Sequence, residues 1–239
     1  MQADLKTFHR FGVYGEAIPT LITVQNSLRL SRVEHLPADL VVAQMRAVLE
    51  DMPPNAAKTG ALGSREVVKA VAEEARGFSF PLVVDPVLAG TLGGLLEEGA
   101  FDALIEHLLP RAFLLTPNLQ EAALIAGIEV RDREGMLQAG RKILELGAQN
   151  VLVKGGHLEG KAVDLLITGE GVVHEFAAER IDTPHTHGTG CTYSAAITAE
   201  LAKGVPLVDA VLSAKRFVTE AIATNPGLGS GKGPLNHFA

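Results

Sequence analysis

The chain has 239 residues, of which 47% are hydrophobic and 21% charged, as is typical of a soluble globular protein with a sizeable core. Its 21 lysines and arginines against 28 aspartates and glutamates give a net charge of −7, which argues against a general nucleic-acid-binding protein. A single cysteine excludes an intrachain disulfide, and no apolar run is long enough to span a membrane. We therefore expect one domain, residues 1–239, of a cytoplasmic protein.

In chain order, the first predicted element is a helix, in which Leu5, Phe8 and Phe11 fall at helical spacing. A β-rich segment at residues 17–24 follows and ends at Gln25. From Pro37 onward, helices alternate with short apolar strands, the pattern of an α/β protein with a mostly parallel sheet. Further helices are expected at residues 39–49, 64–76, 133–146, 191–203 and 206–224, strands at 56–60, 81–85, 112–115 and 150–154, and a hairpin over 164–176.

Two charged side chains end predicted strands. Asp85 ends the strand over residues 81–85, and Lys154 ends the strand over residues 150–154. Because ligands of open α/β sheets bind at the carboxyl ends of the strands, Asp85 is a candidate for a role near phosphate or metal, and Lys154 could neutralise a phosphate. A strand-end Asp can instead cap the next turn, and a strand-end Lys can simply precede a turn. The residues alone leave both alternatives open.

Asn118 and Glu121 follow the strand over residues 112–115. Their spacing predicts a capping box, in which Asn118 is the N-cap of a helix and Glu121 occupies the third helical position. The capping box needs no ligand, so the residues alone favour this structural interpretation.

The segment Gly188-Thr189-Gly190-Cys191 leads into a helix rich in small residues. Gly188 and Gly190 lack a Cβ, so the backbone can turn sharply and approach a ligand closely. The free N–H groups and the dipole at the helix start favour a phosphate. Cys191 lies in the first turn, where the pKa of a thiol is expected to be lowered. The alternative is that Cys191 is a small buried hydrophobic residue.

The segment from His187 to Thr192, followed by Ser-Ala-Ala-Ile at 194–197, resembles the signature of the hydroxymethylpyrimidine/phosphomethylpyrimidine kinases of thiamine biosynthesis. These belong to the ribokinase-like superfamily, most sugar kinases of which carry Asp where this chain has Cys191. Residues 3–8, 12–15 and 24–26 also resemble the pyrimidine-binding region of the family, and the resemblance covers nearly all of the chain. It implies a three-layer α/β/α ribokinase-like fold and ATP-dependent phosphorylation of 4-amino-5-hydroxymethyl-2-methylpyrimidine and then of its monophosphate.

The resemblance also implies roles for the substrate-binding residues. Asp4 and Gln25, with Val24 beside it, match positions that bind the aminopyrimidine ring. A carboxylate and an amide together offer the acceptors and donors that such a ring requires. Judged by position alone, Asp4 could be a helix N-cap and Gln25 an ordinary polar residue at a strand end.

At the nucleotide, the resemblance implies that Glu121 organises Mg²⁺ and that Lys154, Asn118 and Asp85 lie near the phosphates of ATP. The backbone N–H groups of Gly188, Thr189 and Gly190, together with Cys191, would hold the transferring phosphoryl group. Cys191 would then take the proton of the hydroxymethyl group as general base, or would only line this anion hole.

The loop at residues 88–94 and the start of the chain depart from the family pattern. Family members normally begin with a strand and a glycine-rich loop just before the segment that matches residues 2–4, and this sequence has neither. We therefore expect the sheet to lack its usual first strand, either because the start is assigned too far downstream or because the chain is a truncated and inactive relative.

Two other functions remain open. A pyridoxal kinase of the same cysteine-bearing branch would bind a similar ring with a hydroxymethyl group, although the segment around Gln25 favours the pyrimidine. A non-catalytic protein that retains the ligand pocket is the alternative outside the enzymes. The family further implies a homodimer whose ligands are small molecules, not nucleic acid or membrane.

Overall fold

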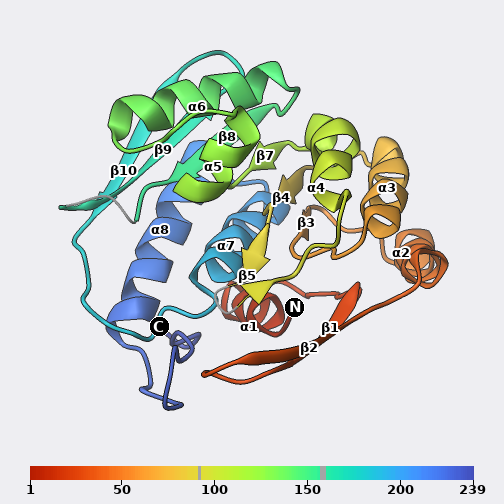
Figure 1. Cartoon of the computed structure of the whole chain (residues 1–239), viewed down its shortest axis with the longest axis horizontal. Coiled ribbons are helices and arrows are strands. Elements are labelled where there is room, and N and C mark those ends of the chain that lie inside the picture. The colour runs from red at the N-terminus through yellow and green to blue at the C-terminus, as the bar shows by residue number, and fades with distance from the viewer. Residues whose placement is uncertain (91–92, 157–159) are drawn as a thin grey trace.

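The computed structural model describes residues 1–90, 93–156 and 160–239. Its main sheet has six strands in the order β10-β9-β8-β7-β4-β3 (Figure 1). In this sheet β3, β4, β7 and β8 run parallel to one another, and β9 runs antiparallel to both of its neighbours. The strands are β3 (Ala57–Thr59), β4 (Leu82–Val84), β7 (Leu114–Leu115), β8 (Asn150–Lys154), β9 (Ala162–Thr168) and β10 (Val173–Ala178). The sheet is mostly parallel, as the sequence predicted.

Helices cover both faces of this sheet and give three layers (Figure 1). One face carries α2 (Ala38–Asp51), α3 (Arg65–Glu74), α4 (Ala100–Ala103), α5 (Leu119–Ala126) and α6 (Arg133–Glu145). The other carries α1 (Gln2–Arg10), α7 (Thr189–Ala202) and α8 (Leu207–Ala223). In the part of the chain that the structure describes, no helix is long and apolar enough to cross a membrane.

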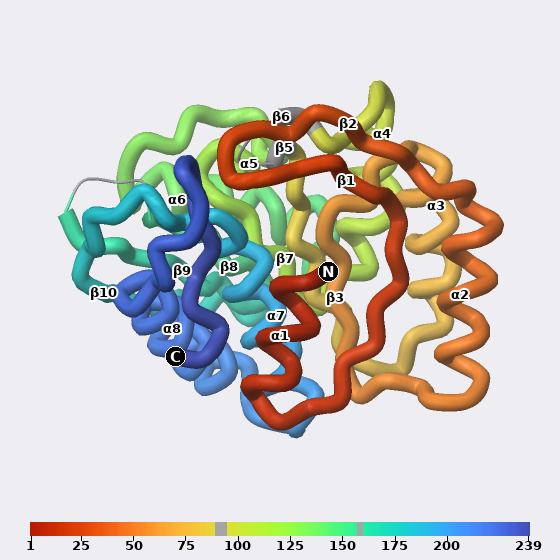
Figure 2. Tube along the Cα trace, turned by 90° about the horizontal axis from the view of Figure 1, so that it is seen from below, coloured from red at the N-terminus to blue at the C-terminus, as the bar shows by residue number. Residues whose placement is uncertain are grey.

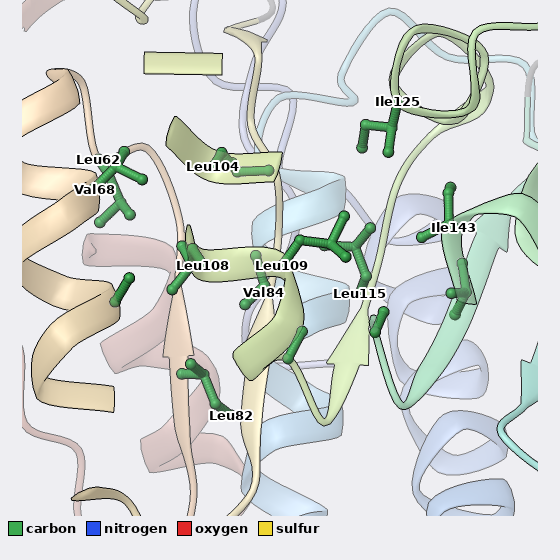
Figure 3. Close-up of a cluster of buried hydrophobic side chains, with 14 of the residues drawn as sticks. Leu62, Val68, Leu82, Val84, Leu104, Leu108, Leu109, Leu115, Ile125 and Ile143 are labelled. Carbon is green, nitrogen blue, oxygen red and sulfur yellow. The ribbon is translucent and has the colours of Figure 1, made fainter. Parts of the chain in front are cut away.

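The central strands are apolar on both faces because both faces are covered. In β4, Leu82 and Val84 belong to the core on the α3 side, whereas Val83 between them belongs to the core on the α7 side. Leu115 and Leu114 of β7 divide in the same way. Successive side chains of a strand point to opposite faces, so a continuous apolar run feeds two cores at once. Figure 3 shows the first core, in which Leu108 and Leu109 lie near Val84.

The helix after the glycine-rich segment is buried on every side. All residues of α7 from Thr192 to Leu201 are buried, and the helix packs against α8, α1 and the sheet. A helix that is enclosed on all sides has no face turned to solvent. The alanines, serine and threonines of α7 are small, so the neighbouring elements can approach it closely. The body of α7 is therefore enclosed, whereas its first residues, from Gly188 to Cys191, are only half-buried.

A two-stranded sheet near the N-terminus lies outside the main sheet. β1 (Leu21–Gln25) and β2 (Leu30–His35) form an antiparallel hairpin that Figure 2 shows running past the N-terminus and β3. The turn of this hairpin is attached to the C-terminal segment, since the Lys232 N–H donates to the Ser27 carbonyl at 2.9 Å. Within the described residues, the outer edge of β3 pairs with no other strand of the main sheet.

The predicted helices and strands are all present, with ends that differ by a few residues. The sequence did not predict β2, the two-residue strands β5 (Ala89–Gly90) and β6 (Gly93–Gly94), or the helical segment that begins with α4. That segment continues as a π-helical turn (Leu104–Leu108) and a 3₁₀ turn (Leu109–Arg111), and a further 3₁₀ turn (Ala75–Gly77) extends α3. The two-residue strands carry too few residues for a periodic pattern, whereas β2 and the segment that begins with α4 were simply missed.

Candidate functional site

The candidate site lies where the carboxyl ends of β4, β7 and β8 meet the N-terminus of α7. Asp85 directly follows β4 and is only 3% exposed. One of its carboxylate oxygens, Oδ1, accepts hydrogen bonds from Thr116 Oγ at 3.2 Å and from Lys154 Nζ at 3.1 Å. The other oxygen, Oδ2, lies 3.3 Å from the hydroxyl of Ser194 in α7. The carboxylate of Asp85 therefore joins two strands to the helix.

Lys154 is the cation of this cluster. It ends β8, and its backbone N–H donates to the Pro117 carbonyl at 2.8 Å. Burial acts to lower the pKa of Lys154, but the carboxylates of Asp85 and Glu121 outweigh it, so the pKa is raised and the ammonium stays charged. The structure thus brings the two strand-end residues Asp85 and Lys154 together, and their contact with phosphate stays a prediction.

The N-terminus of α7 is open beside this cation. Gly188 is the N-cap, with a φ of 86° that favours glycine, and it offers no side chain to cap the helix. A Cβ on Gly190 would lie 3.2 Å from Lys154 Nζ, so glycine lets the ammonium approach the backbone. Uncapped N–H groups and a buried ammonium at one place favour an anion. The helix begins at Thr189, two residues before the predicted start.

Asn118 and Glu121 form the predicted capping box. The Glu121 N–H donates to Asn118 Oδ1 at 2.9 Å, and the Asn118 N–H donates to Glu121 Oε2 at 2.8 Å. Burial raises the pKa of Glu121, and the nearby Asp85 adds to this effect, while Lys154 opposes it. The structural alternative for this pair is therefore confirmed, and the Glu121 carboxyl faces the same cluster.

Asp4 lies on the far side of Cys191 and pairs with a residue that the sequence did not single out. Asp4 is in the first turn of α1, whose N-cap is Met1, so Asp4 is not itself the N-cap. Its Oδ1 accepts a hydrogen bond from Lys58 Nζ of β3 at 3.0 Å. Burial acts to raise the pKa of Asp4, but Lys58 and the amino group of Met1 outweigh it and lower the pKa.

Val24 and Gln25 are not brought into this cluster. Both lie at the end of β1 on the hairpin with exposed side chains, and Val24 is 55% exposed. Among the described residues, no hydrogen bond joins the Gln25 side chain to Asp4. Their predicted contact with a pyrimidine ring stays a prediction.

The predicted acidity of Cys191 is wrong in direction. Burial raises the pKa of the thiol, and the positive charge of Lys58 only partly offsets this effect. The sequence argument considered the helix N-terminus and not the loss of solvent around the sulfur, which destabilises the thiolate. Cys191 is nevertheless in the first turn of α7, as predicted.

Three residues of the site were missed. Thr116 directly follows β7, and its position just before Pro117-Asn118 is the signal that could have identified it. Ser194 lies one helical turn after Gly190, so it shares a helix face with the anion-binding end. Lys58 lies in a three-residue strand of weak propensity, and nothing nearby in the sequence indicates its partner.

The carboxyls of Asp85 and Glu121 fit a Mg²⁺ ion. The two lie close enough for Asp85 to raise the pKa of Glu121, so a divalent cation would relieve their repulsion. Among the described residues, no group of three or more His, Cys, Asp or Glu side chains could hold a metal. Mg²⁺ commonly binds through one or two carboxylates together with water and substrate phosphates, which this pair allows.

Alanine at Asn118 is expected to lower the free energy of unfolding by about 1 kcal/mol, because it removes one half of the capping box. Asp132→Ala is a matched control, since Asp132 caps α6 by accepting a hydrogen bond from Gly135 N–H at 2.8 Å. Urea unfolding should give similar losses for both variants. Only Asn118→Ala should weaken ATP binding, measured by calorimetry, and equal ATP affinities would show that Asn118 is a cap alone.

Comparison with known proteins agrees with this geometry. A family model described as phosphomethylpyrimidine kinase matches residues 1–236. The hydroxymethylpyrimidine/phosphomethylpyrimidine kinase of Rhizobium meliloti strain 1021 is 48% identical over 243 residues, which cover 100% of this chain and 91% of that protein.

Solved structures of two kinds of kinase are similar to the chain. The phosphomethylpyrimidine kinase of Clostridium difficile 630 superposes with a TM-score of 0.82 at 40% identity and covers 92% of each chain. A pyridoxal kinase of Staphylococcus aureus, in complex with AMP-PCP and pyridoxal, superposes with a TM-score of 0.90 at 36% identity and covers 100% of this chain and 88% of its own. The fold is ribokinase-like, and the chain belongs to the phosphomethylpyrimidine kinase family.

Proposed function

We propose that this kinase transfers the terminal phosphoryl group of ATP to 4-amino-5-hydroxymethyl-2-methylpyrimidine and then to its monophosphate, as a step of thiamine biosynthesis. The observation that carries the proposal is the convergence of Lys154, Asp85 and the uncapped N-terminus of α7 at one sheet edge. Anion-binding groups and carboxylates at one place are what phosphoryl transfer requires, because this reaction depends on positioning and charge stabilisation.

Each part of the cluster has a place in the transfer. The N–H groups at Gly188, Thr189 and Gly190 bind the transferring phosphoryl group, while Lys154 neutralises charge on the phosphates. Asp85 holds Lys154 against α7 through its contacts with the ammonium and Ser194. Mg²⁺, held by Glu121 and Asp85 partly through water, would supply further charge neutralisation at the phosphates.

A second group of residues, near Asp4, acts on the pyrimidine that accepts the phosphoryl group. Asp4 accepts hydrogen bonds from the amino group of the pyrimidine, and Gln25 with Val24 closes over the ring from the hairpin. Cys191 is in the first turn of α7, and the charges of Lys58, Asp85 and Asp4 all act on its thiol. A thiolate here takes the proton of the hydroxymethyl group as the oxygen attacks phosphorus.

Pyridoxal is the second candidate acceptor, because a pyridoxal kinase is among the solved structures that superpose well on this chain. Both acceptors are six-membered nitrogen heterocycles with a hydroxymethyl group, so the same anion-binding end and the same base serve either. The family model and the Rhizobium relative favour the pyrimidine.

The deciding experiment measures ADP release with Mg²⁺ and ATP, offering the hydroxymethylpyrimidine, its monophosphate and pyridoxal separately. Turnover on both pyrimidines is the expected result. Turnover on pyridoxal alone would move the proposal to the second candidate. No turnover on any of the three, with ATP binding intact by calorimetry, would make the chain a non-catalytic relative.

We also propose that the enzyme is a cytoplasmic homodimer. Its single cysteine, which suits a reducing compartment, supports this location. The hairpin supports self-association, because Ile22 and Leu28 on it are 56% and 61% exposed. Apolar side chains gathered on one exposed element favour a protein interface. Light scattering of the purified chain tests this, and a monomer mass at micromolar concentration would contradict it.

A further inference from the structure

Lys58 is a buried ammonium on an edge strand. It is the middle residue of β3, the outermost strand of the main sheet, yet its side chain is only 5% exposed. Lysines on edge strands ordinarily extend into water, and a lysine is rarely buried unless it is paired. Burial acts to lower the pKa of Lys58, but Asp4, Cys191 and Asp85 outweigh it, so the ammonium remains charged. Because burying the Lys58 ammonium costs free energy, we expect this charge to act on specific neighbouring groups.

The partners of Lys58 lie on the acceptor side of the site. Its Nζ is 3.0 Å from Asp4 Oδ1, and a Cβ on Gly60 would lie 3.7 Å from the same nitrogen. β3 also packs against α7, the helix that carries Cys191 in its first turn. Lys58 thus reaches from the sheet to the space between α1 and the start of α7.

Several charged groups surround the sulfur of Cys191. Lys58 approaches from β3, Asp85 from the end of β4, Asp4 and the amino group of Met1 from α1, and Lys154 from β8. Lys58 has the largest effect among these charges, and it acts against the effect of burial. The half-buried thiol of Cys191 is therefore surrounded by several charges, of which that of Lys58 favours the thiolate most.

We propose that Lys58 is a positioning residue for phosphoryl transfer, which holds the Asp4 carboxylate at the acceptor ring and keeps a positive charge beside the Cys191 sulfur. This inference rests on the proposed function and adds to it a residue that the capping, strand-end and glycine motifs do not include. Lys58 acts through Asp4 and Cys191 and does not itself contact the transferring group.

The positive charge of Lys58 is needed before phosphoryl transfer begins, because the Cys191 thiol must first lose its proton. The hydroxymethyl proton passes to the thiolate and forms an S–H bond, while an electron pair of the hydroxyl oxygen forms the new O–P bond. The bond between the γ-phosphorus and the β–γ bridging oxygen breaks, and its electron pair leaves with ADP. The thiol then returns the proton to solvent. A buried thiol supplies too little thiolate for this step unless a cation such as Lys58 favours the ionised form.

The test uses the fact that Cys191 is the single cysteine of the chain. The rate of alkylation by iodoacetamide, followed by mass spectrometry between about pH 6 and pH 10, therefore reports the thiol pKa of this residue alone. Lys58→Met should raise the midpoint and slow alkylation at neutral pH about tenfold, the effect of one pKa unit. Asp4→Asn, which removes a negative charge from the same place, should lower the midpoint. Lys58→Arg, which keeps the positive charge, should have the same midpoint as the wild-type chain.

Opposite shifts separate an electrostatic role from a structural one, because loosened packing would move both variants in the same direction. Lys203→Met is the control, since Lys203 is the C-cap at the other end of α7 and should leave the midpoint unchanged. Unchanged midpoints in folded Lys58→Met would overturn the proposal. If that variant does not fold, Asp4→Asn and Lys58→Arg decide, and an unshifted midpoint for Asp4→Asn would overturn it equally.

Turnover gives a second readout. Lys58→Met should lower kcat and raise the KM for the acceptor, with the KM for ATP unchanged, because Lys154 and not Lys58 lies at the phosphates. A raised KM for ATP alone would contradict the assignment. If the wild-type chain phosphorylates none of the three acceptors, the proposed function fails, and the thiol titration still tests Lys58 independently.

Discussion

Replacement of Cys191 by alanine is expected to lower kcat for the hydroxymethylpyrimidine by about 10²- to 10⁴-fold, the usual contribution of a general base. The KM values should change little, because the N–H groups at the start of α7 and the ammonium of Lys154 remain. Steady-state kinetics with each substrate varied in turn measures both. Cys191→Ser should be nearly as slow, since a serine hydroxyl is far less acidic than a thiol.

The pH dependence tests the same role in another way. Burial raises the pKa of the Cys191 thiol, so most molecules carry the protonated, inactive form at neutral pH. The value of kcat/KM should therefore rise with pH through this raised pKa, and the rise should vanish in Cys191→Ala. If the sulfur only lines the anion hole, Cys191→Ala would lose less than about tenfold and keep the pH profile of the wild-type enzyme.

Most of the fold can be predicted from the sequence, because short local patterns of residues indicate where strands and helices lie and which of their faces are buried. The run Leu82-Val83-Val84 is apolar without alternation, which indicates a strand covered on both faces, and the structure places its side chains in two cores. The capping box at Asn118 and Glu121 is equally local, since its two hydrogen bonds join residues three apart. Strand-end residues such as Asp85 and Lys154 follow from the rule that parallel strands end at one edge.

What the sequence does not predict is pairing across distance. Lys58 and Asp4 are 54 positions apart, and neither a periodic pattern nor a motif connects a residue of a short edge strand to the first helix. The direction of the Cys191 pKa shift was missed for a related reason. The helix N-terminus can be identified from the glycines, whereas the burial that outweighs it depends on how α1 and β3 enclose the sulfur.

A second buried ion pair between distant residues, Lys215 with Asp164, contributes to the stability of the fold. Lys215 of α8 donates to Asp164 Oδ2 at 2.7 Å and to the Ala162 carbonyl at 3.0 Å, and the two side chains are 9% and 3% exposed. Asp164 also accepts a hydrogen bond from the Gly155 N–H at 3.0 Å, just after Lys154. The pair therefore joins α8 to β9 and to the end of β8, the strand that carries the site's cation.

Lys215→Met is expected to lower the free energy of unfolding by about 3–5 kcal/mol, because it leaves the Asp164 carboxylate buried without its cation. Urea unfolding measures this, with Lys161→Met as the control. Lys161 pairs with Glu179 at 2.8 Å, but the two side chains are 64% and 79% exposed, so Lys161→Met should lower the free energy of unfolding far less than Lys215→Met does.

The double variant Asp164→Leu/Lys215→Met separates the uncompensated charge from the lost packing. Removing both charges should recover part of the stability, because an apolar pair can replace a buried ion pair at little cost. The recovery should stay incomplete, since the Gly155 N–H then loses its acceptor inside the protein. Equal losses in the single and double variants would mean that Lys215 acts through packing against α7, where its ammonium lies 6.0 Å from the ring centre of Tyr193, and not through charge.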